Sequence, residues 1–201
     1  MRINALALAA TSALLLTACS DSPSDTDIHA ALQPRLEGAS CVTAAMFKSF
    51  PVTLSSTFST GVSSGNAPAF DALTDAGLLA KSDKTYSLTD PGRAAYVEQA
   101  SGFCYSQGYE IAKIKDIAPN TGPMGAAVDK SWIVTVDIRQ KPIAAWAKTP
   151  AIEKLARNPE NLSDVPKTYH VTVGRVKGEQ GLKLLDPRFS IMRGVSVSQG
   201  Y

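Results

Sequence analysis

One serine in the chain lies within the sequence pattern of a catalytic nucleophile. The segment GVSSG at residues 61–65 fits G-x-S-x-G, in which a tight turn from a strand into a helix exposes the serine hydroxyl. A strand-like run precedes the segment and a helix is predicted after it, so Ser63 has the required context. His170 follows in the chain as a candidate base, and three aspartates could orient it: Asp71, Asp116 and Asp164. Together these residues would form a small serine hydrolase.

Other features of the sequence argue against that chemistry. The surroundings of Ser63 are rich in serine, threonine and glycine, where the pattern arises easily in a loop. The chain has no repeated strand–helix alternation and no glycine-rich oxyanion segment, and His170 falls on an ordinary predicted strand. With His29 and His170 as the two histidines there is no zinc-type spacing, and no phosphate or dinucleotide motif occurs. We therefore predict no catalytic residue, metal or cofactor, and keep the serine hydrolase as the alternative.

The first of the three cysteines, Cys19, follows a segment typical of an export signal. Met1 and Arg2 form a positively charged start, and residues 3–18 form a mostly apolar run of sixteen residues. A membrane-spanning helix needs about 20 apolar residues, so this run is too short to be one. Ordinary signal peptidase prefers small residues at positions −1 and −3, whereas Leu16 would occupy position −3 here.

The four residues Leu16-Thr17-Ala18-Cys19 resemble the lipobox of bacterial lipoproteins. That resemblance implies cleavage before Cys19 and attachment of three acyl chains to it, two through its sulfur and one on its amine. At about 0.8 kcal/mol per buried CH₂, three chains anchor a protein firmly in a membrane. Ser20 at position +2 favours the outer membrane, facing the periplasm, over the inner membrane. The competing interpretation is a buried N-terminal helix in which Cys19 is a small apolar residue.

This resemblance divides the N-terminal part of the chain into two segments. Residues 1–18 are predicted to be a cleaved signal peptide, and residues 19–27 a flexible tether, because SDSPSDTD is too polar to pack. Eight such residues reach at most about 28 Å when fully extended. We therefore expect the folded part of the protein close to the lipid surface.

Two cysteines remain for pairing if Cys19 carries lipid. Cys41 and Cys104 both lie in apolar surroundings, and an exported protein with one remaining pair usually joins it as a disulfide. Closing this loop of about 64 residues stabilises the fold by about 4 kcal/mol in the chain-entropy model. Two buried free thiols or a reactive pair are the alternatives.

Residues 66–99 resemble the second half of a winged-helix unit. A short helix is expected over residues 66–77, a hairpin with a polar tip at residues 81–84 follows, and a second helix is expected to end at Gln99. The earlier helices of such a unit could come from residues 28–50. The resemblance implies a winged-helix-like helical unit at the N-terminal side of the mature chain.

DNA reading is not expected of this winged-helix-like subdomain, which we place at residues 28–100. A recognition helix presents basic or amide side chains to base edges and lies against phosphates. The helix here presents Asp71, Thr74 and Asp75 and no basic residue, so its carboxylates would repel phosphate. We predict a scaffold with no nucleic-acid partner.

The pattern changes to strands in the second subdomain, residues 101–201. Apolar and polar residues alternate along residues 132–139 and 169–173, which is typical of half-buried strands and puts His170 on the outer face. Isoleucines recur every third residue along 109–118, which indicates a bulge or a bend. A short helix starting at Thr149 is expected to pack on this mainly antiparallel sheet, so the whole chain is predicted to be α+β.

The charge is nearly balanced, with 20 basic and 18 acidic residues, so no global field points to a polyanionic partner. Six basic residues do gather in 130–157, which indicates either an ordinary solvated face or contact with anionic lipid: Lys130, Arg139, Lys141, Lys148, Lys154 and Arg157. The lipobox, the winged-helix-like unit and the strand-rich second half are similar to uncharacterised Gram-negative envelope lipoproteins. We predict a lipid-anchored envelope protein that binds or scaffolds, with another envelope protein, a glycan or a membrane as its partner.

Overall fold

Two runs of alternating apolar residues form the centre of a large sheet. The computed structural model describes residues 21–55 and 62–197 and has an α+β fold. Strand β8 (Val128–Gln140) pairs antiparallel with β9 (Lys167–Val176), and His170 lies exposed on the outer face. The opposite face buries apolar side chains from both strands: Trp132, Val134, Val136, Ile138, Val171 and Val173. The alternation predicted for these two strands is confirmed.

Strand β7 (Gly102–Pro119) runs through both halves of the large sheet. Its first part pairs with β1 (Glu37–Thr43), and from Tyr109 onward it pairs with β8. Two register shifts in the pairing with β8 interrupt the ladder, as the spacing of the isoleucines predicted. Gly108 lies where β7 changes partners, and a Cβ there would be 2.6 Å from the carbonyl oxygen of Leu36. Only glycine fits this close crossing of backbones.

Three short strands complete the large sheet. Its order is β10-β9-β8-β7-β1-β11, with β6 beside β7, where β10 is Lys183–Leu184, β11 is Val195–Ser196 and β6 is Tyr96–Val97. The pairing of β1 with β11 is parallel and the other pairings in this sheet are antiparallel, so the sheet is mixed.

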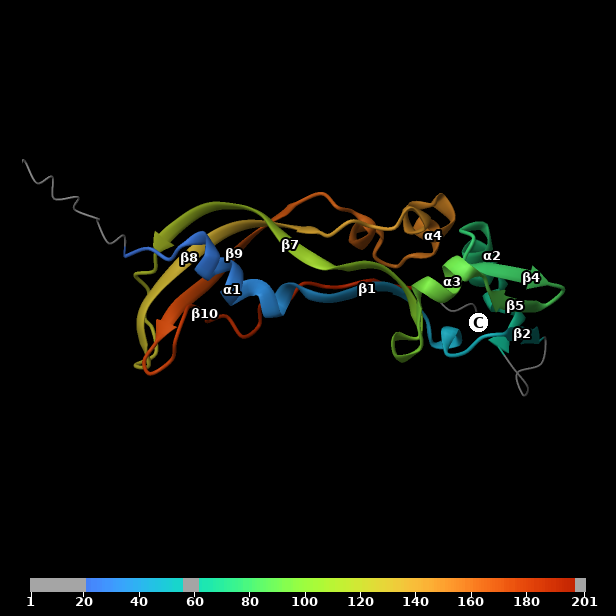
Figure 1. Cartoon of the computed structure of the whole chain (residues 1–201), viewed down its shortest axis with the longest axis horizontal. Coiled ribbons are helices and arrows are strands. Elements are labelled where there is room, and N and C mark those ends of the chain that lie inside the picture. The colour runs from blue at the N-terminus through green and yellow to red at the C-terminus, as the bar shows by residue number, and fades with distance from the viewer. Residues whose placement is uncertain (1–20, 56–61, 198–201) are drawn as a thin grey trace, which may run out of the picture.

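Helix α1 (Asp25–Leu36) lies inside the curl of the large sheet (Figure 1). Ile28, Leu32 and Leu36 recur every four residues and are completely buried against the inner face of the sheet. The helix begins at Asp25, within the predicted tether, because Ser24 and Asp27 form a capping box. Each of these two side chains accepts a hydrogen bond from the other residue's backbone N–H at 3.2 Å. The structure therefore differs from the tether predicted for residues 19–27, the last three of which are helical.

A second, smaller mixed sheet lies at the other end of the molecule. Its order is β3-β2-β5-β4, with β2 parallel to β3 and the other pairs antiparallel. The strands are β2 (Val52–Ser55), β3 (Val62–Ser63), β4 (Leu79–Ser82) and β5 (Thr85–Leu88). Helix α2 (Ala67–Asp75) precedes the β4–β5 hairpin and α3 (Asp90–Ala95) follows it, capped by Thr89, whose hydroxyl accepts from the N–H of Gly92 at 3.0 Å.

The order helix, hairpin, helix predicted for residues 66–99 is present, but the described residues of 28–100 form no winged helix. The helices that a winged-helix unit has before this segment are missing. Helix α1 packs against the large sheet instead, and β1 is one of the strands of that sheet. Only the single 3₁₀ turn η1 (Ala45–Phe47) lies between β1 and β2. Helix α3 ends before the predicted Gln99, since the next two residues pair with β7 instead. The segment 28–100 thus contributes to both sheets.

The disulfide predicted between Cys41 and Cys104 is confirmed, with an S–S distance of 2.01 Å. It joins two residues that face each other on β1 and β7. It therefore lies within the large sheet.

A second hydrophobic core connects the small sheet to the near end of the large one. Phe47 packs edge-to-face against Phe70 of α2 and Phe103 of β7, with ring centroids 5.4 and 5.8 Å apart. Helix α4 (Pro150–Leu155) starts where predicted and buries Ile152, but it packs in this core beside α2. The remaining 3₁₀ turns are η2 (Ser64–Asn66), η3 (Glu98–Ala100), η4 (Ala145–Lys148) and η5 (Pro159–Leu162).

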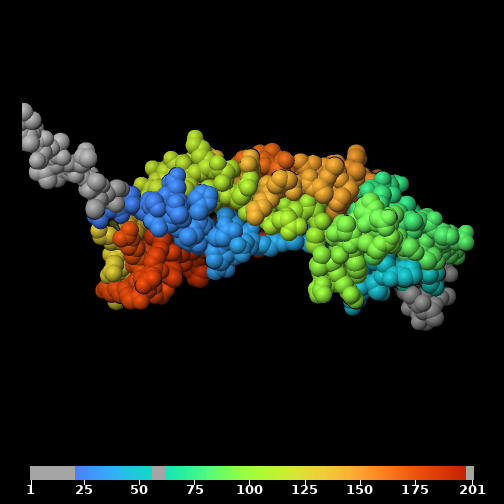
Figure 2. Space-filling view, viewed as in Figure 1, coloured from blue at the N-terminus to red at the C-terminus, as the bar shows by residue number. Residues whose placement is uncertain are grey.

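The molecule is elongated, with α1 and the curled part of the large sheet at one end and the small sheet at the other (Figures 1 and 2). Strand β7 runs between the two ends and contributes to both cores. Within residues 21–55 and 62–197, no helix is long and apolar enough to cross a membrane.

Candidate functional site

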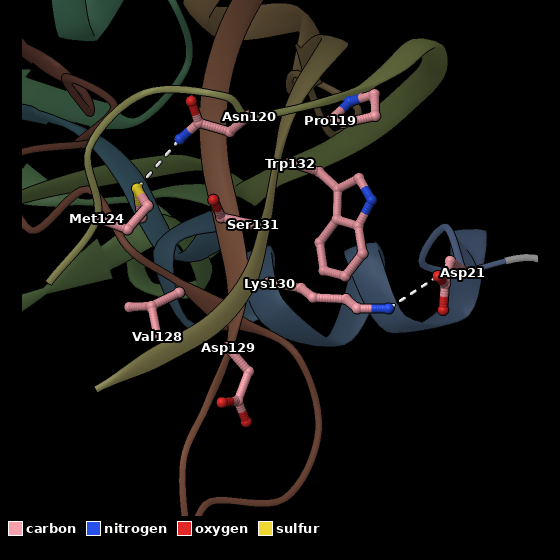
Figure 3. Close-up of a pocket in the computed structure, with 9 residues that line it drawn as sticks. All are labelled: Asp21, Pro119, Asn120, Met124, Val128, Asp129, Lys130, Ser131 and Trp132. Atoms are coloured by element: carbon pink, nitrogen blue, oxygen red, sulfur yellow. Dashed lines mark hydrogen bonds and ion pairs between the residues drawn. The ribbon is translucent and has the colours of Figure 1, made fainter. Parts of the chain in front are cut away.

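An open hollow of about 340 Å³ lies at the end of the large sheet where the described chain begins. The end of β7, the loop that follows it and the first residues of β8 form its walls, and Asp21 lies on its rim (Figure 3). The side chains around it are both apolar and charged: Asp21, Pro119, Asn120, Met124, Val128, Asp129, Lys130, Ser131 and Trp132.

An ion pair holds Asp21, the first described residue, at this hollow. Lys130 Nζ lies 2.8 Å from Asp21 Oδ2, and its hydrogen bond lowers the pKa of the Asp21 carboxyl. Both side chains are exposed, so salt screens the pair and its contribution to stability is small. Its effect is positional, because it places residue 21 against the sheet.

The loop between β7 and β8 is ordered by its own hydrogen bonds. The backbone N–H of Asn120 donates to the Ser131 carbonyl at 2.9 Å, and its side chain accepts from Gly122 N at 3.0 Å. The Asn120 amide also lies 3.2 Å from the Met124 sulfur (Figure 3). Residues 120–127 carry no charge, and Met124 is more than one third exposed. An uncharged loop with an exposed thioether is suited to an apolar or interfacial partner.

A tryptophan forms the floor of the hollow. Trp132 is 4% exposed, and the guanidinium of Arg175 on β9 lies 5.9 Å from the centre of its ring. This cation–π contact fixes the indole at the sheet surface. The hydroxyl of the neighbouring Ser131 is buried without a hydrogen-bond partner. Trp132 and Ser131 are thus largely covered, and the accessible lining of the hollow comes from exposed residues that include Asp21, Met124, Asp129 and Lys130.

The predicted nucleophile and base lie far apart in the fold. Ser63 is on β3 of the small sheet, where its hydroxyl accepts from the backbone N–H of Gly65 at 3.2 Å. His170 is on β9 of the large sheet, and its Nδ1 lies 3.0 Å from the hydroxyl of Thr135. The structure therefore does not bring Ser63 and His170 together.

The three candidate orienting acids are also dispersed. Asp71 binds Lys81 and Tyr86 of the hairpin, and Asp164 binds Lys148 at 3.0 Å. Asp116 is exposed on β7. Gly61 of the motif lies outside the described residues. In the part of the chain that the structure describes, no three His, Cys, Asp or Glu side chains gather as metal ligands.

The six basic residues of 130–157 extend from β8 to the segment just after α4. Three of them bind acidic partners: Lys130 binds Asp21, Arg139 binds Glu110 at 2.7 Å, and Lys148 binds Asp164. Arg139 and Lys148 are therefore partly neutralised, and the stretch offers less free positive charge than its composition indicates.

Cys19, the predicted lipidation site, and the signal peptide at residues 1–18 lie outside the described residues. Sequence reasoning missed the hollow, although all its lining residues except Asp21 lie within residues 119–132, because a hollow depends on how the two strand ends and the loop between them curve in space. The uncharged run at residues 120–127 was its one local signal. Comparison of the chain with protein-family models, with curated proteins and with solved structures found no match.

Proposed function

We propose that the protein is a lipid-anchored cell-envelope lipoprotein that acts as a non-catalytic binding or scaffolding module. The main support for this proposal is the position of Asp21, which forms an ion pair with Lys130 at the rim of the hollow. Only one residue separates Asp21 from Cys19. Two residue steps span at most about 7 Å, so acyl chains on Cys19 would hold this end of the large sheet at the lipid surface.

Two other observations support the proposed compartment, namely the disulfide and the residue after Cys19. A Cys41–Cys104 disulfide is typical of proteins exported to an oxidising environment. Ser20 after the lipobox cysteine favours the outer membrane, with the folded part in the periplasm.

The elongated shape suits a module that reaches away from the membrane. With the hollow at the lipid surface, the small sheet is the part of the protein farthest from the anchor (Figure 1). We propose that an envelope protein, a glycan or anionic lipid is the partner, and that nucleic acid is not. Helix α2 supports the last point, because its exposed Asp75 and the Asp71 carboxylate would repel phosphate.

Metabolic labelling tests the anchor. Cells expressing the wild-type chain are grown with an alkyne fatty acid, and the protein should take up the label and fractionate with membranes. The Cys19→Ala variant should do neither, because the acyl acceptor is gone, and Ser22→Ala serves as the matched control that keeps labelling. Equal labelling of wild type and Cys19→Ala would remove the basis of the proposal.

A fluorophosphonate probe tests the non-catalytic part. Such probes label serines that an adjacent base has activated. We expect no labelling, because the Ser63 hydroxyl accepts a hydrogen bond from Gly65 N at 3.2 Å and His170, the candidate base, lies on β9 of the other sheet. Stoichiometric labelling that disappears in both Ser63→Ala and His170→Ala would favour a lipid-anchored serine hydrolase instead.

A further inference from the structure

The loop between β7 and β8 is exposed and carries no charge. No charged residue occurs between Asp116 and Asp129 in the sequence, and residues 121–127 are all exposed. The hairpin tip at the other end of the molecule differs, because residues 81–84 carry three charges in four positions. Exposed loops usually contain charged or strongly polar side chains, whereas an exposed segment of small residues, proline and methionine is a sign of an interaction surface.

The carbonyl groups near the tip of this loop already have hydrogen-bond donors within the protein. The Gly125 carbonyl accepts from the backbone N–H of Val128 at 2.9 Å, and the Ala127 carbonyl accepts from that of Lys177 at 2.8 Å. The Ala126 carbonyl between them accepts from Lys177 Nζ at 3.0 Å. Lipid supplies no water to a backbone carbonyl, so a segment that enters it must satisfy these groups within the protein. The three consecutive carbonyls therefore suit a lipid environment.

The charged side chains at the base of the loop pair with one another. Lys130 Nζ lies 2.8 Å from Asp21, and Lys177 Nζ lies 3.9 Å from Asp129. A second hollow shares Asp129 and is lined by more acidic than basic side chains: Asp27, Asp129, Arg175 and Glu179. Attraction to anionic lipid needs a surplus of basic side chains. The charge around the loop therefore favours a zwitterionic headgroup layer.

The lipid anchor identifies the surface that this loop contacts. We propose that residues 121–127 enter the headgroup layer of a zwitterionic membrane and form a second contact beside the anchor. Asp21 and Met124 border the same hollow (Figure 3), and only one residue separates Asp21 from Cys19. Two residue steps span at most about 7 Å, so acyl chains on Cys19 would bring the lipid surface to the loop. The inference rests on the proposed lipid anchor and gives the protein a lipid-facing surface.

The loop contact operates only together with the anchor. The largest side chain within residues 121–127 is Met124, so the loop buries too little apolar surface to hold the protein on a membrane alone. A short tether raises the effective concentration of the loop at the lipid, so even a weak contact is then occupied. Cys19→Ala protein is therefore expected to leave the membrane although its loop is intact.

Methionine oxidation in the acylated wild-type protein tests the contact. Met124 and Met192 are both exposed. The Met124 sulfur lies 3.2 Å from the Asn120 amide, and that of Met192 lies beside an asparagine amide at 3.4 Å, so Met192 is a matched control in the same chain. The protein is inserted into preformed phosphatidylcholine vesicles and treated with the charged oxidant chloramine-T. Met124 should become sulfoxide at least about tenfold more slowly than in Cys19→Ala protein without vesicles, as read by mass spectrometry, and Met192 should react equally in both.

The pattern of protection decides whether the loop contacts lipid. Protection of Met124 alone supports the contact. Equal oxidation of Met124 with and without vesicles, in protein that carries the fatty-acid label, overturns the loop contact and leaves the anchor standing. Protection of both Met124 and Met192 means that the molecule lies flat, which overturns a contact limited to the loop. Absence of the fatty-acid label removes the anchor, and the inference then falls with the proposed function.

The charge of the lipid separates an apolar contact from an electrostatic one. Protection of Met124 should change less than about twofold when about 30% of the lipid is anionic phosphatidylglycerol, because the loop carries no charge. It should change equally little when NaCl is raised to about 0.5 M. Protection that requires the anionic lipid and disappears at high salt would assign the contact to Lys130 and Lys177 and overturn the proposal.

A single charge placed within the loop tests its entry into lipid. A Cβ at Gly125 would meet no atom within 4 Å, and its backbone is outside the left-handed region, so this position accepts a side chain. Gly125→Asp should raise the oxidation rate of Met124 on vesicles at least about tenfold, because a carboxylate loses its hydration when it leaves water. Gly125→Ser is the matched control and should keep the protection. Equal protection in the two variants would show that the loop stays in water and would overturn the proposal.

Discussion

At the residue scale, one carboxylate ties α2 to the hairpin beside it. Asp71 Oδ1 accepts hydrogen bonds from Lys81 Nζ at 2.7 Å and from the Tyr86 hydroxyl at 2.8 Å. The bond from Lys81 is the main cause that lowers the pKa of Asp71 below its ordinary value of 3.8. A carboxyl whose pKa is lower in the folded state stabilises the fold fully above its unfolded pKa, and that stabilisation disappears as pH falls through the folded value.

We therefore expect a pH-dependent effect of Asp71→Asn. At pH 7 it should reduce the free energy of unfolding by about 0.5–1 kcal/mol, a small value because the side chains of Asp71 and Lys81 are nearly half exposed. As pH falls below 3.8 toward about 2, the difference from wild type should shrink, since the wild-type carboxyl becomes progressively protonated. Urea unfolding at the two pH values measures this, with exposed Asp75→Asn on the same helix as control. An equal loss at both pH values would contradict a charge-based role.

The disulfide is the second prediction at this scale. Cys41→Ser or Cys104→Ser should each lower the free energy of unfolding by about 2–5 kcal/mol, because the bond limits the freedom of the unfolded chain. Denaturant unfolding measures the loss, and reduction of the wild type should reproduce it. The double variant is the control, since a reductant should not change its stability. If both sulfurs in exported protein react readily with an alkylating agent before reduction, the bond is absent there.

At the element scale, the position of α1 depends on its first turn. The Ser24–Asp27 capping box satisfies free N–H groups at the start of a helix that covers the inner face of the large sheet. Ser24→Ala should reduce the free energy of unfolding by about 1 kcal/mol. Thermal or urea unfolding measures it, and Thr26→Ala, exposed in the same turn, should have no destabilising effect. A loss in Thr26→Ala as large as that in Ser24→Ala would show that the cap is not its cause.

At the scale of the whole molecule, the proposed anchor and the elongated shape define an orientation. A fluorophore on Met124→Cys, in the loop beside Asp21, should be strongly quenched by quenchers placed in the lipid headgroup region of vesicles that carry the anchored protein. The same fluorophore on Asp83→Cys, at the tip of the β4–β5 hairpin, should be quenched little, because it lies at the opposite end (Figure 1). Cys19→Ala should abolish quenching at both positions. Similar quenching at the two positions of the anchored protein would mean that it lies flat on the membrane.

The sequence by itself determined the features that depend on near neighbours in the chain. Alternation along residues 132–139 specifies a strand with one buried face, and the isoleucine spacing in β7 specifies its irregular pairing. The pair Cys41 and Cys104 was predictable from cysteine number and setting. The capping box at Ser24 was equally local, but the polar composition of residues 20–27 concealed it.

Only the tertiary structure decided which elements pair and which side chains meet. Strand β1 is short and has no clear period, and it belongs to the large sheet because β7 and β11, far away in the chain, supply its hydrogen bonds. Pairing over such sequence separations depends on the summed packing of the whole fold, which no local pattern records. The same reason separates Ser63 from His170 and brings Lys177 to the carbonyl groups of the loop between β7 and β8.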